Sequence, residues 1–555
     1  MSLWQTLLRP VAHLAARHAS AQLEAFLQAH RNTARVQHEL RDEIVSRTAN
    51  TAFGRDHGFA KIRTWDDWNR QVPVCSYDQL RPYFDRVLAN EPTALLPAGQ
   101  PVLMFSQTSG TTGRPKNIPV TPRFLTDIRR GWNVFGLAAL KDHPDAWLRH
   151  ILQISSPKTE SKSSSGLPCG AISGLLAETQ KRIVRRMYCV PPCVSTIKDP
   201  EAKYYTILRC GIGRDVAFIT TANPSSTIRM VEVGQRHVEA LLRDVAEGTL
   251  TPPGGISGDI GHRLRFGKNP ALARRMEEGI ARDGQLLPRH FWNISFLANW
   301  TGGTLKLYLS RLRELFGDVP VRDIGLLASE GRFTVPLADN TPAGVAEITG
   351  NILEFIPADQ REQDAPDVLQ AHEVEVGEEY FLVVTNWAGL FRYDLDDRVR
   401  VVDRMDDSPV LEFLSRGKHT ANITGEKLTE HQIVEAMKRA AAALRAEVNR
   451  FIVQGRFAST PYYELRMEAD DPAVPQRLAE TLDAELGELN MEYRSKRSSG
   501  RLGPIRPIRL PRGTLQRAED NHIRRRRGRG EQYKHQYLMT DVQAEPSEQA
   551  VDAEE

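Results

Sequence analysis

The stretch FSQTSGTTGRPKNIPVT, residues Phe105 to Thr121, places hydroxyls, glycines, an arginine and a lysine between two apolar runs. Phosphate oxygens only accept hydrogen bonds, so a polyphosphate-binding loop needs hydroxyl and N–H donors, glycines that admit the backbone, and a cation. This loop contains all of them, in Thr108, Ser109, Gly110, Thr111, Thr112, Gly113, Arg114 and Lys116. We therefore predict a phosphate-binding loop, with a polar surface turn as the alternative.

The Walker pattern of nucleotide-binding loops does not fit this stretch. Two residues separate Gly110 from Gly113, and Arg114-Pro115 stands before the lysine. Residues 117–120 are extended in character, so the arrangement is strand–loop–strand. Apolar residues at helical spacing follow over 122–140, and Thr121 is placed to cap that helix.

Short apolar strands alternate with helical patterns outward from the loop, which predicts mixed α/β sheets. The predicted strands are VLMFSQ (102–107), VAFITT (216–221), DIGLLAS (323–329) and YFLVVTN (380–386). Residues 51–62, TAFGRDHGFAKI, are predicted to be a glycine-punctuated loop, and the polar stretch 358–372 a surface loop. Thr429 to Gln432 form a capping box that opens a helix through Leu444.

These patterns predict an α/β fold with two domains. The first, 1–415, is a large domain of mixed sheets (a β-barrel plus β-sheets flanked by helices). A hinge over 416–420 leads to a smaller, mobile α+β domain over 421–540. Residues 541–555 carry six acidic residues and no basic one, which predicts a disordered tail.

Composition sets broad limits on the function. The chain has 555 residues, 41% hydrophobic and 26% charged, with a net charge of +3, as in ordinary globular enzymes. The odd number of cysteines, five, fits a reducing compartment, the cytoplasm. Cys189 and Cys193 could bind zinc or be ordinary buried thiols. No apolar run reaches eighteen residues, so no membrane span is expected, and residues 1–30 are typical of an amphipathic helix.

The nonapeptide TSGTTGRPK, Thr108 to Lys116, resembles the phosphate-loop signature of AMP-forming adenylating enzymes. Other stretches narrow the resemblance to the Gretchen Hagen 3 acyl-acid amido synthetases, including their bacterial members, over residues 50–538. These stretches are TAFGRDHGFAKI (51–62), VPVCSYDQLRPYFDRVL (72–88), GLLASEG (325–331), VVTNWAGLFRYDLDDRVRV (383–401), GEKLTE (425–430) and EQYKHQY (531–537).

The resemblance implies an ATP- and Mg²⁺-dependent ligase that works as a monomer. A small-molecule acyl acid reacts with ATP to give an acyl-adenylate and pyrophosphate. An amine, usually an amino acid, then takes the acyl group and releases AMP. One alternative is a related ligase whose acceptor is coenzyme A, a carrier thiol or an alcohol. Another is a non-catalytic nucleotide- or RNA-binding protein on the same scaffold.

The resemblance also implies roles for individual residues. Ser329 contributes a hydroxyl near the α-phosphate, and Glu330 is the catalytic carboxylate and metal ligand. Asp397 binds the ribose hydroxyls, although Asp396 stands where the family has glycine. Thr385 and Trp387 line the acyl pocket, with a core tryptophan as the alternative for the latter. Leu326 stands where an aromatic residue often covers adenine.

The C-terminal part adds two rival lysines. Lys427 and Lys534 each match a family position from which a lysine reaches the phosphate, and a surface lysine is the alternative for both. Arg416 lies at the predicted hinge, where adenylating enzymes rotate their C-terminal domain. The basic run 524–529 is short and falls in a family loop, so nucleic acid is not the expected partner.

Overall fold

The computed structural model describes residues 20–107, 116–180, 182–302, 308–417, 420–421, 423, 426, 428–458, 460–498, 502–525 and 535–544. The chain forms two compact units. In the described ranges, the first unit takes 20–302 and 312–413, and the second takes 308–311 and everything from 414 onward. The predicted hinge over 416–420 stays a prediction, and residues 418 and 419 lie outside the described ranges.

The opening stretch is an antiparallel hairpin, as its sequence predicts. β1 (Met104–Gln107) pairs with β2 (Asn117–Val120), and Gln107 opposite Asn117 is the last pair before the loop. β5 (Pro168–Gly170) lies parallel to β1 and completes this sheet with β4 (Ser161–Lys162). The predicted cap is confirmed: Thr121 Oγ1 accepts the N–H of Phe124 at 3.1 Å and opens α6 (Pro122–Asp142).

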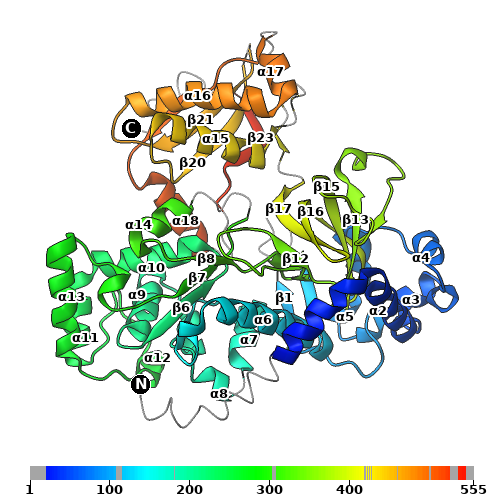
Figure 1. Cartoon of the computed structure of the whole chain (residues 1–555), viewed down its shortest axis with the longest axis horizontal. Helices are drawn as coiled ribbons and strands as arrows, with labels where there is room; N and C mark the ends of the chain where they lie inside the picture. The colour runs from blue at the N-terminus through cyan, green and yellow to red at the C-terminus, as the bar shows by residue number, and fades with distance from the viewer. Residues whose placement is uncertain are drawn as a thin grey trace. The chain divides into compact units, whose positions relative to one another are not determined.

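A four-stranded parallel sheet forms a second layer of this unit, in the order β3, β6, β7, β8. Its strands are His150–Gln153, Val216–Thr221, Phe296–Asn299 and Val321–Asp323. α9 (Pro200–Gly211) and α10 (Pro224–Arg236) lie beside the sheet in Figure 1. Val134 and Phe135 of α6 pack against Ala217 and Phe296, so α6 joins the hairpin to this sheet.

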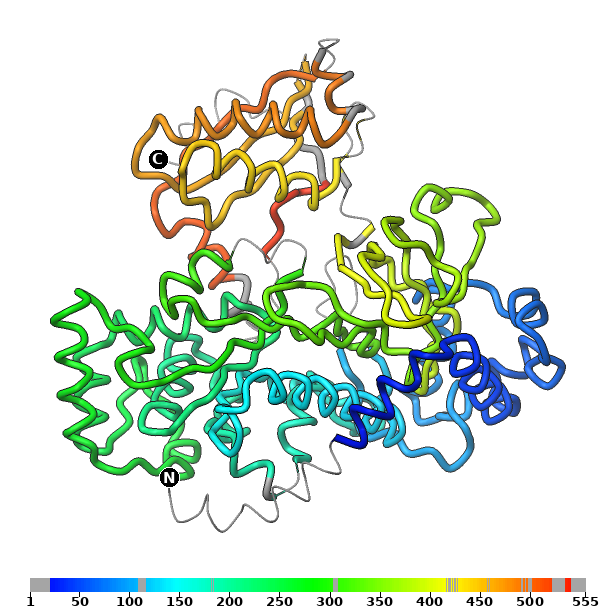
Figure 2. The backbone as a smooth tube through the Cα atoms, viewed as in Figure 1, coloured from blue at the N-terminus to red at the C-terminus, as the bar shows by residue number. Residues whose placement is uncertain are grey.

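A seven-stranded sheet has the order β11, β12, β17, β16, β15, β13, β14. The strands are Thr334–Val335, Gly344–Ala346, Ser408–Arg416, Leu390–Met405, Glu379–Asn386, Asn351–Pro357 and Leu369–Gln370. β15 and β16 run side by side as the yellow-green tubes of Figure 2. N-terminal helices cover this sheet, and Phe53 stacks on Phe391 with ring centroids 4.7 Å apart.

Two predictions of local structure are wrong. Residues 51–62 form α3 (Ala52–Asp56) and a 3₁₀ turn (Phe59–Lys61), because Thr51 Oγ1 accepts the Gly54 N–H and the rings of Phe53 and Phe59 are buried. DIGLLAS is not one strand. Gly325 turns the chain at φ +87°, where a Cβ would lie 2.4 Å from the carbonyl oxygen of Thr334.

The second unit has a four-stranded sheet in the order β22, β21, β20, β23. The strands are Arg506–Leu510, Tyr462–Glu468, Phe451–Phe457 and Leu538–Ala544. The capping box at Thr429 and Gln432 is confirmed, and it opens α15 (Glu430–Leu444). Residues 541–544 belong to β23, which pairs with β20, so these four residues are not part of a disordered tail. The other residues of the predicted tail, 545–555, lie outside the described ranges.

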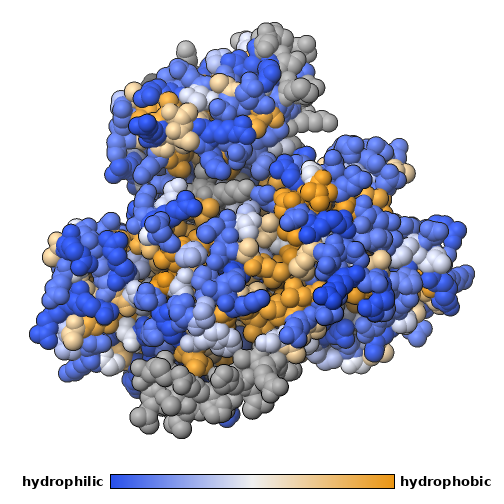
Figure 3. All heavy atoms as spheres, viewed as in Figure 1, coloured by the Kyte–Doolittle hydropathy of each residue, from blue (hydrophilic) through white to orange (hydrophobic). Residues whose placement is uncertain are grey.

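Hydrophilic residues dominate the face drawn in Figure 3, with hydrophobic residues gathered in patches among them. Val376 and Ile508 are the large apolar side chains classed as exposed in the described ranges. Among the described helices, none combines the length and the apolar character that crossing a membrane requires.

Candidate active site

Lys116 stands at the base of the hairpin, where the loop over 108–115 returns to β2. Its Nζ donates to the Tyr393 hydroxyl at 2.7 Å and lies 5.5 and 5.4 Å from the ring centroids of Tyr77 and Tyr393. The Tyr77 hydroxyl accepts the N–H of Asn117 at 2.9 Å. Burial raises the pKa of Tyr77 to about 12, and the charge of Glu330 adds to this shift. The ammonium thus lies between two phenol side chains at the end of the predicted phosphate loop.

Ser329 and Glu330 form the two-residue turn of a second hairpin, between β9 (Leu327–Ala328) and β10 (Gly331–Arg332). The Ser329 hydroxyl donates to the carbonyl oxygen of Gln107, the last residue of β1, at 3.3 Å. Glu330 is 2% exposed. Both residues of the turn therefore lie at the end of the β1–β2 hairpin from which the loop over 108–115 extends. This hairpin lies more than two hundred residues earlier in the chain.

Asn386 connects this turn to the end of β15. Its Nδ2 donates to the carbonyl oxygen of Glu330 at 2.9 Å and to Asn351 Oδ1 at 3.1 Å. Its Oδ1 accepts the N–H of Ala388 at 3.0 Å and so shapes the turn after β15. These bonds fix the backbone at Glu330 relative to two strands of the large sheet.

Thr385 and Trp387, the predicted acyl-pocket residues, are both buried in this region. The Thr385 hydroxyl accepts the N–H of Arg392 at 2.7 Å, so it supports the pairing of β15 with β16. The carbonyl oxygen of Trp387 accepts from Thr121 Oγ1 at 3.3 Å, and the Arg123 guanidinium lies 5.3 Å from its ring centroid. Trp387 packs within the main hydrophobic core, which is the alternative interpretation of this residue.

Asp397 is the last residue of a bulge in β16. Phe381 pairs with Arg398 and Val383 pairs with Asp394, so Leu382 alone lies opposite residues 395–397. Asp396 takes a left-handed conformation with φ +61°, and Asp397 is 4% exposed. The residue that replaces the family's glycine therefore has a backbone conformation that glycine adopts readily.

A second left-handed residue, Arg392 with φ +43°, precedes Tyr393 in the same strand. The Arg392 guanidinium pairs with Glu354 at 3.0 Å, and both side chains are at most 4% exposed. It also donates to the carbonyl oxygen of Val72 at 2.8 Å. In β16 each of these two left-handed residues thus directly precedes a candidate site residue.

Leu326, proposed to take the place of an adenine-stacking aromatic residue, is 6% exposed and belongs to the main core. Its N–H donates to Thr334 Oγ1 at 2.8 Å, and its carbonyl oxygen accepts the Phe333 N–H at 2.8 Å. These bonds hold the segment that leads into the Ser329–Glu330 turn.

Several predicted site residues lie outside the described ranges: Thr108, Ser109, Gly110, Thr111, Thr112, Gly113, Lys427 and Lys534, together with the side chain of Arg416. Both rival lysines adjoin buried residues of the second unit. Glu426 accepts the Ile423 N–H at 2.9 Å and a hydrogen bond from the Tyr463 hydroxyl. His535 Nε2 lies 2.8 Å from the carbonyl oxygen of Phe451. The neighbours of the two lysines therefore do not distinguish between them.

The described residues fit a nucleotide with its metal ion. Ser106 is fully buried just before the loop, and its Oγ has no hydrogen-bond partner in the described part of the chain. The same part contains no cluster of three His, Cys, Asp or Glu side chains that could hold a metal. Magnesium often uses one or two carboxylates together with phosphate oxygens and water, and Glu330 is placed for that mode.

Sequence analysis gave no role to Tyr77, Tyr393, Asn351 or Asn386, although three of them lie in stretches that carry the family resemblance. Tyr77 and Tyr393 could have been identified because each is a tyrosine that stands next to charged or polar residues of a family motif. Asn351 had no such signal, because its role depends on the pairing of β13 with β15.

Comparisons with known proteins cover nearly the whole chain. The GH3 family N-terminal domain matches residues 22–321, the central domain 345–416, and the C-terminal domain 431–543. Jasmonoyl–L-amino acid synthetase JAR6 of Nicotiana attenuata is 25% identical over 531 residues, 90% of each chain. Indole-3-acetic acid-amido synthetase GH3.10 of Arabidopsis thaliana is 26% identical over 534 residues, 87% of this chain and 89% of that one.

A solved structure, the GH3.15 acyl acid amido synthetase, has the same fold. It superposes with a TM-score of 0.82 at 22% sequence identity, over 94% of each chain. Because all three family domains match in order along the sequence, the chain belongs to the GH3 family.

Proposed function

We propose that this chain is an ATP-dependent acyl-acid amido synthetase. In the first step a carboxylate oxygen of the acid attacks the α-phosphorus of ATP, and the bond to pyrophosphate breaks. In the second step an amino-acid nitrogen attacks the acyl carbon, loses a proton, and AMP leaves. The names of the similar proteins, jasmonoyl–L-amino acid and indole-3-acetic acid-amido synthetases, support this reaction class.

The observation that carries the proposal is the meeting of three segments at the hairpin base. Lys116, directly before β2, contacts Tyr393 of β16. The Ser329–Glu330 turn bonds to Gln107 of β1, and the charge of Glu330 acts on Tyr77 beside Lys116. A partly buried lysine and a serine hydroxyl are suitable donors for phosphate oxygens, on which negative charge develops during adenylation. The loop over 108–113 adds the remaining donors in this proposal.

Glu330 holds the magnesium ion in this proposal, and Asp397 binds the ribose hydroxyls. The metal neutralises phosphate charge when it is bound. Asn386 donates to the backbone carbonyl oxygen of Glu330 and so fixes the backbone that carries this buried carboxylate, which suits a metal ligand. Lys427 and Lys534 of the second unit are the two candidates for the catalytic lysine in this proposal, and a conformational change at the hinge over 416–420 accompanies the step from adenylation to amide formation.

The acid and the acceptor are identified by an assay with a panel of substrates. Purified protein with ATP and magnesium is incubated with aryl, indolyl and fatty acids, each with hydroxylamine, amino acids or coenzyme A. We expect hydroxamate and amide products and AMP with one acid class. Thioester without amide identifies the coenzyme A ligase instead. Nucleotide binding without turnover of any acid contradicts an enzymatic role.

Glu330→Gln tests the site within this assay. It keeps the side-chain volume and removes the charge, so we expect kcat for adenylation to fall about 10²- to 10³-fold, with a smaller change in KM for ATP. Glu362→Gln, at an exposed position in the 358–372 loop, is the matched control and should behave as wild type. Equal activities of the two variants contradict the role of Glu330.

A further inference from the structure

The loop over 358–372 carries an arginine that reaches the bulge of β16. Arg361 donates from one guanidinium nitrogen to Asp394 Oδ2 at 2.6 Å and to Asp396 Oδ1 at 3.1 Å. Its guanidinium carbon lies 4.5 Å from the ring centroid of Phe381, on the neighbouring strand just before the bulge. Arg361 therefore contacts both strands at the place where their register changes.

Asp394 completes this arrangement from within the strand. Its Oδ1 accepts the backbone N–H of Asp396 at 2.8 Å, while its Oδ2 accepts from Arg361. A side chain that binds the N–H two residues ahead closes a local turn and stabilises unusual backbone angles. Two carboxylates so close together repel each other, and the guanidinium between them offsets that repulsion.

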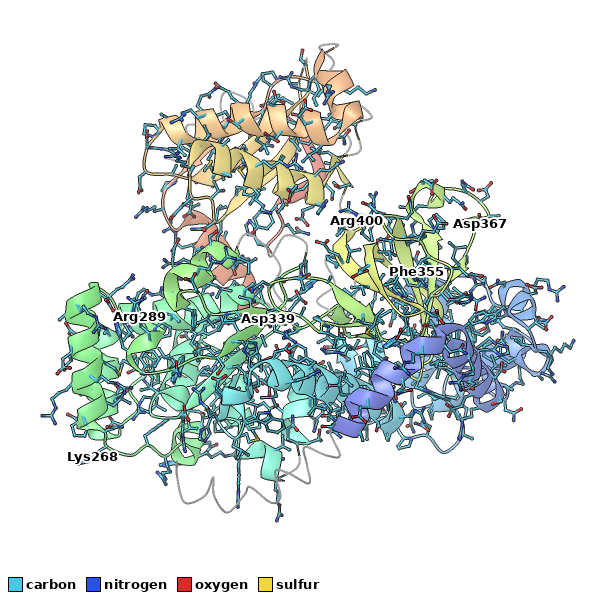
Figure 4. The ribbon with its side chains drawn as sticks, viewed as in Figure 1. Lys268, Arg289, Asp339, Phe355, Asp367 and Arg400 are labelled. Atoms are coloured by element: carbon cyan, nitrogen blue, oxygen red, sulfur yellow. The ribbon has the colours of Figure 1, made fainter. Side chains whose placement is uncertain are left out.

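The guanidinium is itself held in place. Its side chain is 21% exposed, and the side chains of Asp394 and Asp396 are 16% and 21% exposed. Burial lowers the pKa of Arg361, whereas the hydrogen bond and charge of Asp394 and the charge of Asp396 raise it. The net effect is a raised pKa, so the guanidinium keeps its charge. Gln360 and Asp367, the latter labelled in Figure 4, exchange two hydrogen bonds of 3.0 and 2.8 Å that close the loop beside Arg361.

We propose that Arg361 is a positioning residue for nucleotide binding, which through Asp394 holds Asp396 in the left-handed conformation and so orients Asp397. Aspartate tolerates this conformation less well than glycine does. The salt bridge and the turn closed by Asp394 supply the support that a glycine at this position does not need. The effect on nucleotide rests on the proposed ribose role of Asp397, whereas the effect on the backbone does not.

Four proteins test the idea: wild type, Arg361→Met, Asp396→Gly and the double variant. Methionine keeps an apolar stem over Phe381 and removes the charge. We expect Arg361→Met to raise KM for ATP about three- to tenfold with kcat little changed, and Asp396→Gly to be near wild type. In the Asp396→Gly background the effect of Arg361→Met should largely disappear, since glycine adopts the bulge conformation unaided.

Thermal unfolding of the same four proteins tests the backbone part separately. Asp396→Gly should raise the Tm more in the Arg361→Met background than in the wild-type background. Arg400→Met is the matched control: Arg400, labelled in Figure 4, lies farther along β16 and pairs with Glu379, away from the bulge. It should leave KM for ATP unchanged.

The outcomes separate this inference from the proposed function. Equal effects of Arg361→Met on KM in both backgrounds, or none in either, overturn the positioning role. Absence of the Tm coupling overturns the support of Asp396. If the Tm coupling is present but wild-type protein neither binds AMP in calorimetry nor adenylates any acid, the proposed function fails and the structural device remains.

Discussion

The two left-handed residues of β16 differ in how they are supported, although each directly precedes a candidate site residue. Arg392 precedes Tyr393, and its salt bridge to Glu354 is almost completely buried. Asp396 precedes Asp397, and its salt bridge to Arg361 is about one-fifth exposed. A buried charge pair is costly to break because the remaining charge stays without compensation, whereas a partly exposed one can be solvated.

This difference indicates that the backbone of β16 is supported in one way before Tyr393 and in another way before Asp397. At Tyr393 the local conformation is part of the core, so changes there affect folding. At Asp397 the proposed support comes from a loop arginine, so we expect changes there to affect the proposed nucleotide binding more than folding. The predictions below test this division.

Breaking the buried pair should have the largest effect on stability. Glu354→Gln removes the charge that compensates Arg392 and weakens the contact with Trp68 Nε1, which lies 3.3 Å from Glu354 Oε2. We expect a loss of about 3–5 kcal/mol of unfolding free energy, seen as a lower denaturant midpoint. Arg361→Met should lower that midpoint much less. A larger shift for Arg361→Met than for Glu354→Gln reverses the comparison.

Removing the charge at Asp397 should affect nucleotide affinity most. A ribose contact made equally in the ground and transition states is uniform binding, so Asp397→Asn should raise KM for ATP and leave kcat nearly unchanged. A hydrogen bond to a charged group contributes about 1.5–3 kcal/mol, which corresponds to roughly ten- to hundredfold. Steady-state kinetics with saturating acid measures both constants. If kcat falls and KM does not, Asp397 acts on the reacting phosphate instead.

The smallest effect is expected at Tyr393, whose hydroxyl accepts from Lys116. Tyr393→Phe removes one acceptor and keeps the ring, so kcat/KM for ATP should fall about two- to tenfold. Lys116→Met alone should cost more, because it removes the cation itself. In the Lys116→Met background, Tyr393→Phe should change nothing further, and full additivity of the two substitutions contradicts the coupling.

Local features of this protein could be predicted from the sequence, and the contacts between distant segments could not. The cap at Thr121, the capping box at Thr429 and the hairpin around the loop depend on residues a few positions apart. Capping hydrogen bonds and turn preferences act over that range, so the sequence pattern predicts them.

The mistaken predictions involve residues whose partners lie elsewhere in the chain. The break in DIGLLAS occurs at Gly325, packed against the backbone of Thr334, and the helices of 51–62 form because Phe53 and Phe59 are buried. The glycine-punctuated stretch 51–62 has the local character of a loop, whereas the apolar stretch DIGLLAS has that of a strand. Burial of two phenylalanines changes the outcome in 51–62 because the apolar area removed from water outweighs weak local propensity.

The family and the reaction class could be predicted from the sequence, and the candidate residues proposed from it, because motifs such as Thr108 to Lys116 contain the donors and charges that the chemistry needs. Tertiary structure alone decided how Asp396 occupies a position suited to glycine. The support that we propose comes from Arg361, thirty-five residues away, which the pairing of β13 with β15 brings to the bulge of β16. Strand register and loop closure create that contact, and neither depends on the residues next to Asp396 in the chain.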